Sequence, residues 1–282
     1  MKRFACLILV LLVLPGCSGL IFMPEKKTYV TPAMLHIKSE DVYFHSGKYV
    51  LHGWWLHAKK PVKGTVLFLH GNAENISTHI ASVYWLPAQG YDVFLFDYRG
   101  YGQSGGKPDL PGIHQDYAAA LDYLFHRPAA NKTNVFVFGQ SLGAAVVLVG
   151  TDTSPYKSRL RAVIVEGAFT SYREVAREMF GRFWLTWLLQ WPLSFTINDD
   201  YRPIDHIARI SPTPILLIHS EQDEVIPFHH ALDLYAAARE PKTLWVVKNI
   251  AHIHTFTKAK YRRKLLEYLQ QHLAKQTNSS HL

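Results

Sequence analysis

The chain has 282 residues, of which 48% are hydrophobic and 18% charged, and its formal net charge is +8. This composition is typical of a globular protein and excludes a disordered or fibrous chain. No Ser/Gly-rich linker, charge block or internal repeat marks a boundary, so we expect one large domain rather than two small ones.

Residues 1–16 have the pattern of an export signal. Two basic residues precede an unbroken apolar run at residues 4–14, which is too short to span a bilayer as a helix. The run ends in Leu-Pro-Gly-Cys, and this ending resembles the lipobox of bacterial lipoproteins. The resemblance implies lipid attachment at Cys17 and, because Ser18 follows rather than Asp, a place on the outer membrane facing the periplasm. The alternatives are an ordinary signal peptide or a plain N-terminal helix.

Cysteine usage and charge bear on the partners of the mature chain. Cys6 would leave with the signal, so Cys17 would be the single cysteine left and no intrachain disulfide could form. A basic cluster at residues 258–264 could attract anionic lipid or nucleic acid, or it could be the solvated face of a helix with an apolar opposite face. Because no nucleic-acid-binding motif accompanies it, we favour the helix face. We expect membrane contact through Cys17 and no nucleic-acid partner.

Apolar runs and helical patterns alternate across residues 50–274, which we take as the folded domain. Residues 17–49 should form a tether and the first strands, and residues 275–282 a flexible tail. Strands that are apolar on both faces and alternate with helices predict a mostly parallel sheet flanked by helices, with ligands at the carboxyl ends of the strands. The predicted strands are 50–57, 64–70, 91–97, 135–138, 162–165, 215–219 and 243–247, and the predicted helices are 76–88, 113–126, 142–149, 228–238 and 255–274.

The segment at about residues 170–211 interrupts this alternation. It is rich in aromatic residues, and positions 180, 184, 187, 188 and 191 would share one face of a helix. It lies between two strands, so we expect a short helical cap over the sheet. Trp184, Trp187 and Trp191 either pack on the core or line an apolar pocket for an acyl substrate.

The sequence Gly-Gln-Ser-Leu-Gly at residues 139–143 matches the pattern G-x-S-x-G. A match of this kind is weak alone, but here a strand precedes it and a very apolar helix follows. A serine on a tight strand-to-helix turn projects its hydroxyl above the sheet, where the helix N-terminus favours developing negative charge. We therefore predict Ser141 as a nucleophile.

A serine hydroxyl needs a base, and the expected chain order is serine, acid, histidine. Asp223 and His252 each come just after a predicted strand, so the three side chains can converge above the sheet. His252 would take the proton from Ser141, and Asp223 would hold the imidazole ring in the correct tautomer. The rivals are His254 as the base and the flanking Glu221 and Glu224 as the acid; we favour His252 and Asp223.

The tetrahedral intermediate of such a reaction requires two N–H donors. We assign the backbone N–H of Leu142, directly after the nucleophile, and the backbone N–H of Asn72, in the loop after the strand at 64–70.

These motifs together resemble the α/β-hydrolases, in particular the small branch with serine-aminopeptidase-like and protein-depalmitoylase-like members. The resemblance covers about residues 50–272; one departure is Ala251, where the family often has Gly. It implies the α/β-hydrolase fold with a short cap, and a serine hydrolase that acts on ester or thioester bonds without a cofactor. The matching pieces are His-Gly-Asn-Ala at 70–73, Asp-Tyr-Arg-Gly-Tyr-Gly-Gln-Ser at 97–104, the serine motif, the Asp223 loop and His252.

Other functions fit the sequence less well. A serine peptidase or a non-catalytic lipid-anchored binding protein would share most of these features. Epoxide hydrolase chemistry would want Asp in place of Ser141. The G-x-G-x-x-G pattern at 100–105 suggests dinucleotide binding, but Gly106, Pro108 and Pro111 should prevent a helix from beginning there. The His229-His230 pair has no third ligand at a suitable spacing, so we predict no metal.

Overall fold

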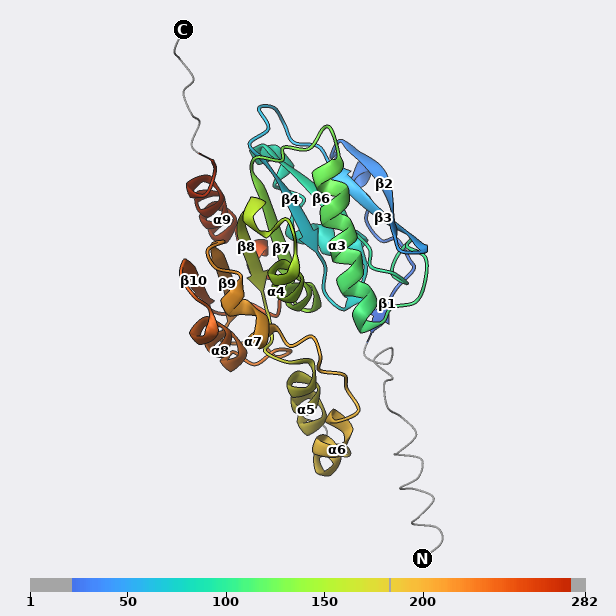
Figure 1. The fold of residues 1–282 in the computed structure, drawn as a ribbon, viewed down its shortest axis with the longest axis vertical. Coiled ribbons are helices and arrows are strands. Elements are labelled where there is room, and N and C mark those ends of the chain that lie inside the picture. The colour runs from blue at the N-terminus through green and yellow to red at the C-terminus, as the bar shows by residue number, and fades with distance from the viewer. Residues whose placement is uncertain (1–21, 183, 275–282) are drawn as a thin grey trace, which may run out of the picture.

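The computed structural model describes residues 22–182 and 184–274 (Figure 1). The predicted signal peptide, Cys17, Leu14-Pro15-Gly16 before it and the C-terminal tail lie outside these residues. Within them, no helix is both long and apolar enough to cross a membrane.

The centre of the fold is an eight-stranded sheet in the order β10-β9-β8-β7-β4-β6-β3-β2. The strands from β10 to β6 pair in parallel, and β3 and β2 are antiparallel additions at one edge. The two-residue strands β1 and β5 pair in parallel with each other as a separate small sheet. The strand bounds are β1 Met23–Pro24, β2 Ser39–Ser46, β3 Tyr49–Leu56, β4 Gly64–Leu69, β5 Ala73–Glu74, β6 Tyr91–Phe96, β7 Val135–Gln140, β8 Leu160–Glu166, β9 Ile215–Ser220 and β10 Lys242–Val247.

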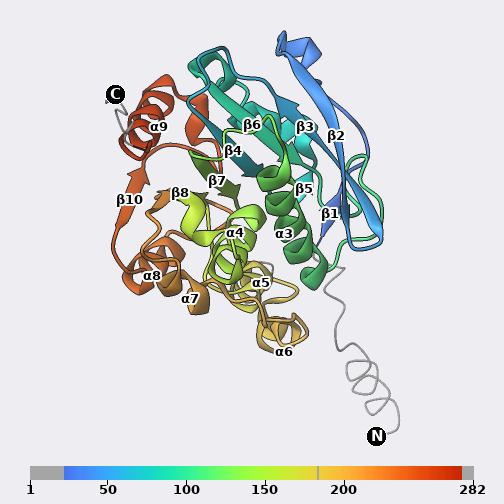
Figure 2. The same cartoon turned by 45° about the horizontal axis from the view of Figure 1, so that its top comes forward.

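Helices cover both faces of the sheet (Figures 1 and 2). The α-helices are α2 Ile76–His79, α3 Leu110–His126, α4 Leu142–Thr153, α5 Tyr172–Arg182, α6 Gln190–Ser194, α7 Pro203–His206, α8 His229–Ala237 and α9 Ala259–Gln271. Short 3₁₀ helices, η2 to η8, lie at Ala33–Leu35, Ile80–Ser82, Pro87–Gln89, Lys157–Arg159, Trp187–Leu189, Ile207–Arg209 and Thr255–Thr257.

Strand β7 shows why the sheet is buried on both faces. Val135 and Val137 belong to one apolar cluster, together with side chains of α3 and α4. Phe136 and Phe138 belong to the other, together with residues of α9. Because successive side chains of a strand point to opposite faces, each of the two layers takes every second residue. The predicted α/β-hydrolase fold, with its mostly parallel sheet, is confirmed.

Several predicted elements differ in the structure, and one of them, the helix expected at 255–274, is the 3₁₀ helix η8 followed by α9. The helix expected at 76–88 is three short helical pieces, α2, η3 and η4. Helix α3 begins at Leu110, so Pro111 does not block it as we expected; proline is tolerated in the first turn, where its missing N–H would have no partner in the helix. Its first turn is capped by the Asp109 carboxylate, which accepts from Gly112 N at 2.8 Å. The cap is not one helix but α5, η6 and α6 in succession, so positions 180–191 do not share one continuous helical face.

Candidate active site

Ser141 lies on a sharp turn between β7 and α4. Its φ of 53° and ψ of −115° are outside the regions that non-glycine residues normally adopt. The turn leaves no room for side chains beside it, because a Cβ on Gly139 would lie 2.4 Å from the oxygen of Gly143. A Cβ on Gly143 would in turn lie 2.4 Å from Leu69 O. The hydroxyl of Ser141 does not cap α4 within the described chain, so it remains available above the sheet.

Asp223 and His252 are in direct contact. Nδ1 of His252 lies 2.6 Å from Oδ2 of Asp223, and the other carboxylate oxygen accepts from Val225 N at 2.9 Å and Ile226 N at 2.8 Å. Burial opposes the ionised form of Asp223, but the hydrogen bond from His252 and the backbone N–H bonds outweigh it and hold its pKa below the usual range. Asp223 is therefore an acceptor at neutral pH, so the Nδ1–H of His252 donates to it and Nε2 is the ring nitrogen left for another partner.

The His252 ring lies beside the turn that carries the serine. Gly167, directly after β8, has a φ of +63°, and a Cβ there would lie only 2.7 Å from Cε1 of His252. Strand β8 neighbours β7, and Ser141 N donates to Glu166 O at 2.8 Å. Nε2 of His252 is buried and has no hydrogen-bond partner among the described residues. The atom that would accept a proton is thus held near the elbow and left unpaired.

The loop after β4 faces the elbow. A Cβ on Gly71 would lie 3.5 Å from Cβ of Ser141. The side chain of Asn72 is held from two sides, since its Oδ1 accepts from the Tyr101 hydroxyl at 2.9 Å and from Met23 N at 3.3 Å. Leu142 is the first residue of α4, whose first N–H groups have no partner inside the helix. The two residues predicted to supply N–H donors therefore border the same turn.

Residues 97–104 form a loop that contacts the start of the Asn72 loop and helix α3. The Tyr98 hydroxyl donates to His70 O at 3.1 Å, which fixes the start of the Asn72 loop. Arg99 donates to the buried carboxylate of Asp116 on α3 through Nε and Nη2, at 3.0 and 2.8 Å. Helix α3 begins only at Leu110, well after the glycine pattern, so no helix N-terminus follows that pattern directly.

A buried network joins the serine turn to the histidine loop. The Gln140 side-chain amide donates to the Glu166 carboxylate at 2.6 Å and to Ile253 O at 3.2 Å. The other Glu166 oxygen accepts from Thr255 N at 3.0 Å. Burial raises the pKa of Glu166. Our sequence analysis missed this residue, although a charged side chain at the end of an otherwise apolar strand is a signal that could have found it.

Comparison with known proteins identifies the family. A family model described as serine aminopeptidase S33 matches residues 60–203, a stretch that includes the serine turn and the Asn72 loop. The protein YfhR of Escherichia coli K12 is 32% identical, and the alignment covers 95% of each chain. The chain belongs to this family of α/β-hydrolases. The α/β-hydrolase domain-containing protein WAV2 of Arabidopsis thaliana is 36% identical over 83% of this chain and 76% of its own.

Solved structures share the architecture of this α/β-hydrolase. The Pyrococcus furiosus esterase Pf2001 superposes with a TM-score of 0.73 at 22% identity, and covers 90% of this chain and 98% of its own. Est1E from Butyrivibrio proteoclasticus gives 0.66 at 17% identity, over 83% of this chain and 99% of its own. At these identities the likeness concerns the fold.

The rivals of the predicted site residues lie differently in this hydrolase. Glu221, Glu224 and His254 are exposed, whereas Asp223 is buried. Trp184, Trp187 and Trp191 are also exposed, at the surface of the cap. The tryptophans therefore do not pack on the core, which was one of our two expectations for them.

The cap is tied to the loop that carries Asp223. Arg182, at the end of α5, donates to Glu224 O and to Val225 O. Glu178 lies between the two histidines at the start of α8, with its carboxylate oxygens 3.2 Å from Nε2 of His229 and 3.2 Å from Nε2 of His230. These contacts hold α5 against the body of the hydrolase.

Another element of the structure therefore supplies a third candidate metal ligand for the histidine pair, which the sequence spacing did not offer. Glu178, His229 and His230 have candidate ligand atoms within 4.8 Å of one another. His230 is fully buried and also lies 2.8 Å from Thr170 Oγ1 through Nδ1. Burial lowers its pKa, so the ring is neutral at neutral pH and can donate to Glu178. The Glu178 carboxylate thus lies within hydrogen-bond distance of both histidines and joins the cap to the body.

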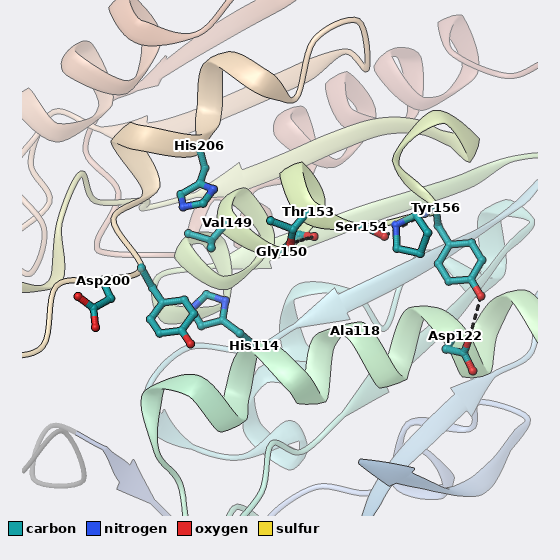
Figure 3. Close-up of a pocket in the computed structure, with 12 residues that line it drawn as sticks. His114, Ala118, Asp122, Val149, Gly150, Thr153, Ser154, Tyr156, Asp200 and His206 are labelled. Atoms are coloured by element: carbon teal, nitrogen blue, oxygen red, sulfur yellow. Dashed lines mark hydrogen bonds between the residues drawn. The ribbon is translucent and has the colours of Figure 1, made fainter. Parts of the chain in front are cut away.

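A hollow of about 420 Å³ lies away from this site, between α3, α4 and the segment before α7 (Figure 3). The ring of His114 stacks on Tyr201 there, with centroids 4.3 Å apart. Burial lowers the pKa of His114 to about 3, which keeps it neutral. None of Ser141, Asp223 and His252 lines this hollow.

Proposed function

We propose that this hydrolase cleaves carboxylic ester or thioester bonds through an acyl-enzyme on Ser141. The observation that carries the proposal is the 2.6 Å contact between His252 and Asp223, with the opposite ring nitrogen buried and unpaired among the described residues. A ring held this way is oriented as a base and has one nitrogen left for the serine hydroxyl.

The reaction follows from these groups. His252 Nε2 takes the hydroxyl proton as Ser141 Oγ attacks the acyl carbon, and Asp223 stabilises the imidazolium that forms. The backbone N–H groups of Leu142 and Asn72 donate to the oxyanion of the tetrahedral intermediate; one such donor is typically worth about 3 kcal/mol of barrier. Collapse breaks the bond to the alcohol or thiol, which leaves with the proton from His252. Water then attacks the acyl-enzyme with His252 again as base, which releases the acid and restores Ser141.

A fluorophosphonate probe and a set of p-nitrophenyl esters test this proposal. We expect the probe to label Ser141 and the Ser141→Ala variant to lose both labelling and hydrolysis. Ser154→Ala, on the loop after α4, serves as the matched control and should behave as the wild type. Ester hydrolysis undiminished in Ser141→Ala would refute the proposal, and a wild-type protein that takes no label would favour a non-catalytic binding protein.

The second candidate is a serine peptidase, which is favoured by the description of the matching family model. The same site would form the acyl-enzyme and expel an amine instead of an alcohol. Aminoacyl p-nitroanilides and matched p-nitrophenyl esters of the same acyl group separate the two. A kcat/KM for the amide within tenfold of that for the ester would favour the peptidase.

We propose also that lipid on Cys17 anchors the mature chain to the bacterial cell envelope, on the outer membrane facing the periplasm. The support is the signal-like pattern of residues 1–16 and the single cysteine that follows it. Several acyl chains hold a protein firmly, whereas one binds only marginally. Labelled fatty acid should be incorporated into the wild type and not into Cys17→Ala, and that variant should move to the soluble fraction. Membrane retention of Cys17→Ala would place the anchor elsewhere.

A further inference from the structure

The cap exposes a concentration of large apolar side chains that has no counterpart elsewhere in the described chain. The exposed fractions reach 86% for Trp184, 77% for Leu188 and 71% for Leu185. A soluble surface seldom keeps so many large apolar side chains exposed within one short segment, and exposed apolar surface of this kind marks a binding surface for protein or membrane. We call it the cap face: Trp184, Leu185, Trp187, Leu188, Trp191 and Phe195.

The chemistry of the cap face fits a lipid surface. Tryptophan is enriched where a membrane meets water, because its ring is apolar and its N–H is polar. Arginines of α5 border the face, with Arg177 4.9 Å from the ring of Trp191 and Arg173 5.4 Å from that of Phe195. Long basic side chains can lie along apolar groups while their charge reaches anionic headgroups.

The acidic residues of α5 do not oppose this. Glu174 accepts from Thr170 Oγ1 at 2.5 Å, and Glu178 lies against the histidines of α8. These carboxylates are therefore turned towards the body of the hydrolase. Arg177 lies 3.6 Å from a Glu178 carboxylate oxygen, whereas Arg173 forms no ion pair among the described residues. Arg173 therefore supplies positive charge beside the cap face, which suits an anionic bilayer.

The shape of the cap points the same way. In both views α5 and α6 project from the body of the molecule (Figures 1 and 2). The residues of the cap face belong to η6, α6 and the segments directly beside them, which lie on this projection. Met179 and Leu189 of the cap are also exposed, whereas Met34 and Tyr43 are exposed on the body.

The start of the described chain faces the same way as the cap. Strand β1 pairs with β5, which follows the carboxyl end of β4, and the cap follows the carboxyl end of β8. Met23 N donates to the Asn72 side chain, so the chain enters beside the candidate active site. Cys17 is six residues before Met23, and an extended chain advances at most about 3.6 Å per residue, which limits their separation to about 22 Å. A lipid on Cys17 therefore holds the active-site edge of the sheet close to the bilayer.

From these observations we infer that the cap face docks on an anionic lipid bilayer and that the hydrolase acts on acyl esters or thioesters held at that surface. The inference rests on the proposed ester hydrolysis and on the proposed anchor for its geometry. Docking would place the cap face in the headgroup region, with Ser141 behind it at the carboxyl edge of the sheet. It also explains why side chains that a pocket would bury are exposed in the isolated chain.

Tryptophan fluorescence of the full lipidated chain on phosphatidylglycerol-containing vesicles with brominated acyl chains tests the docking. Three of the seven tryptophans lie on the cap face, and Trp54, Trp55, Trp85 and Trp245 are buried in the body. Bromine should therefore quench the emission of the cap tryptophans only. The double variant Leu185→Asp/Leu188→Asp keeps all seven tryptophans and should lose this quenching, because carboxylates resist burial in lipid.

The matched control is Met34→Asp/Tyr43→Asp, which places the same charges at exposed apolar positions of the body. It should leave the quenching unchanged. Sedimentation with the vesicles measures binding through the lipid anchor separately. Protein that still sediments but is no longer quenched is therefore anchored while its cap is out of the lipid. Equal quenching in the wild type and in Leu185→Asp/Leu188→Asp would overturn the docking. Cap-face burial that persists without vesicles and scales with protein concentration would instead identify a second copy of the chain as the occupant, and would also overturn it.

A hydrolysis assay distinguishes the effect of docking from that of catalysis. Leu185→Asp/Leu188→Asp should lower hydrolysis of a vesicle-held acyl ester at least tenfold relative to a soluble p-nitrophenyl ester. Ser141→Ala should lose hydrolysis of both substrates and keep the quenching. Retained hydrolysis in Ser141→Ala would thus count against the proposed function. Unchanged quenching in Leu185→Asp/Leu188→Asp would count against the docking.

Discussion

Gly167 provides a direct test of whether the position of His252 sets the rate. In Gly167→Ala the added Cβ would lie 2.7 Å from Cε1 of His252, about 0.7 Å closer than the 3.4 Å at which ordinary contacts begin. The ring cannot retreat freely, because Nδ1 is held at 2.6 Å by the Asp223 carboxylate. Either the ring or the strand end carrying Gly167 must move.

The expected effect has two parts. The left-handed φ of +63° adds a backbone penalty of about 1–2 kcal/mol for any side chain. Displacing the base by a large fraction of an ångström should lower kcat for p-nitrophenyl ester hydrolysis by roughly 100-fold. Because the ring acts in the chemical step more than in binding the ester, KM should change little.

Gly47→Ala separates the backbone penalty from the displacement of His252. Gly47 has a similar φ of +57°, but an added Cβ would meet nothing within 4 Å. Both variants should lose comparable stability from the backbone in urea unfolding, and only Gly167→Ala should lose activity. If Gly167→Ala folded and kept an activity within twofold of that of Gly47→Ala, the assignment of His252 as the base would be wrong.

Three further predictions concern the acid and the buried network. Asp223→Asn should keep its backbone hydrogen bonds but favour the wrong tautomer of His252, lowering kcat by roughly 10³–10⁴-fold, whereas the exposed Glu224→Gln should be neutral in the same ester assay. Glu166→Ala leaves the donors of Gln140 and Thr255 without their acceptor, so urea unfolding should show that the free energy of unfolding falls by about 2–5 kcal/mol. The fall should be smaller in Glu166→Gln, and a fall below about 1 kcal/mol in Glu166→Ala would contradict the network. The folded state lowers the pKa of Asp223 from 3.8, so the carboxylate should make the wild type more stable than Asp223→Asn above about pH 4. This difference in the free energy of unfolding should fade as the pH falls through the folded pKa, and a difference that grows on acidification would contradict the prediction.

Much of the fold could be predicted from the order of the residues. Strands that are apolar on both faces need helices on both sides, and that requirement fixed the sheet and its layers. The serine motif was informative because a strand and a helix flank it, and the acid and the histidine because each follows a strand. Carboxyl ends of parallel strands meet at one edge, so residues 141, 223 and 252 were expected to approach one another.

The chain alone did not reveal contacts between elements that are distant in sequence. Glu166 joins Gln140 to Thr255, and Glu178 meets the histidines of α8, because the packing of strands and cap brings them together. No spacing of residues in the sequence indicates these side-chain contacts. The cap was misjudged as one helix because periodicity does not show where a helix breaks.

The sequence by itself therefore determined the class of fold and the kinds of side chain at the site, since both depend on hydrophobic pattern and chain order. Only the tertiary structure decided which nitrogen of His252 contacts Asp223, why Gly167 must lack a side chain, and that the cap tryptophans are exposed. Burial and direction of side chains are properties of packing, which residues far apart in the chain create together.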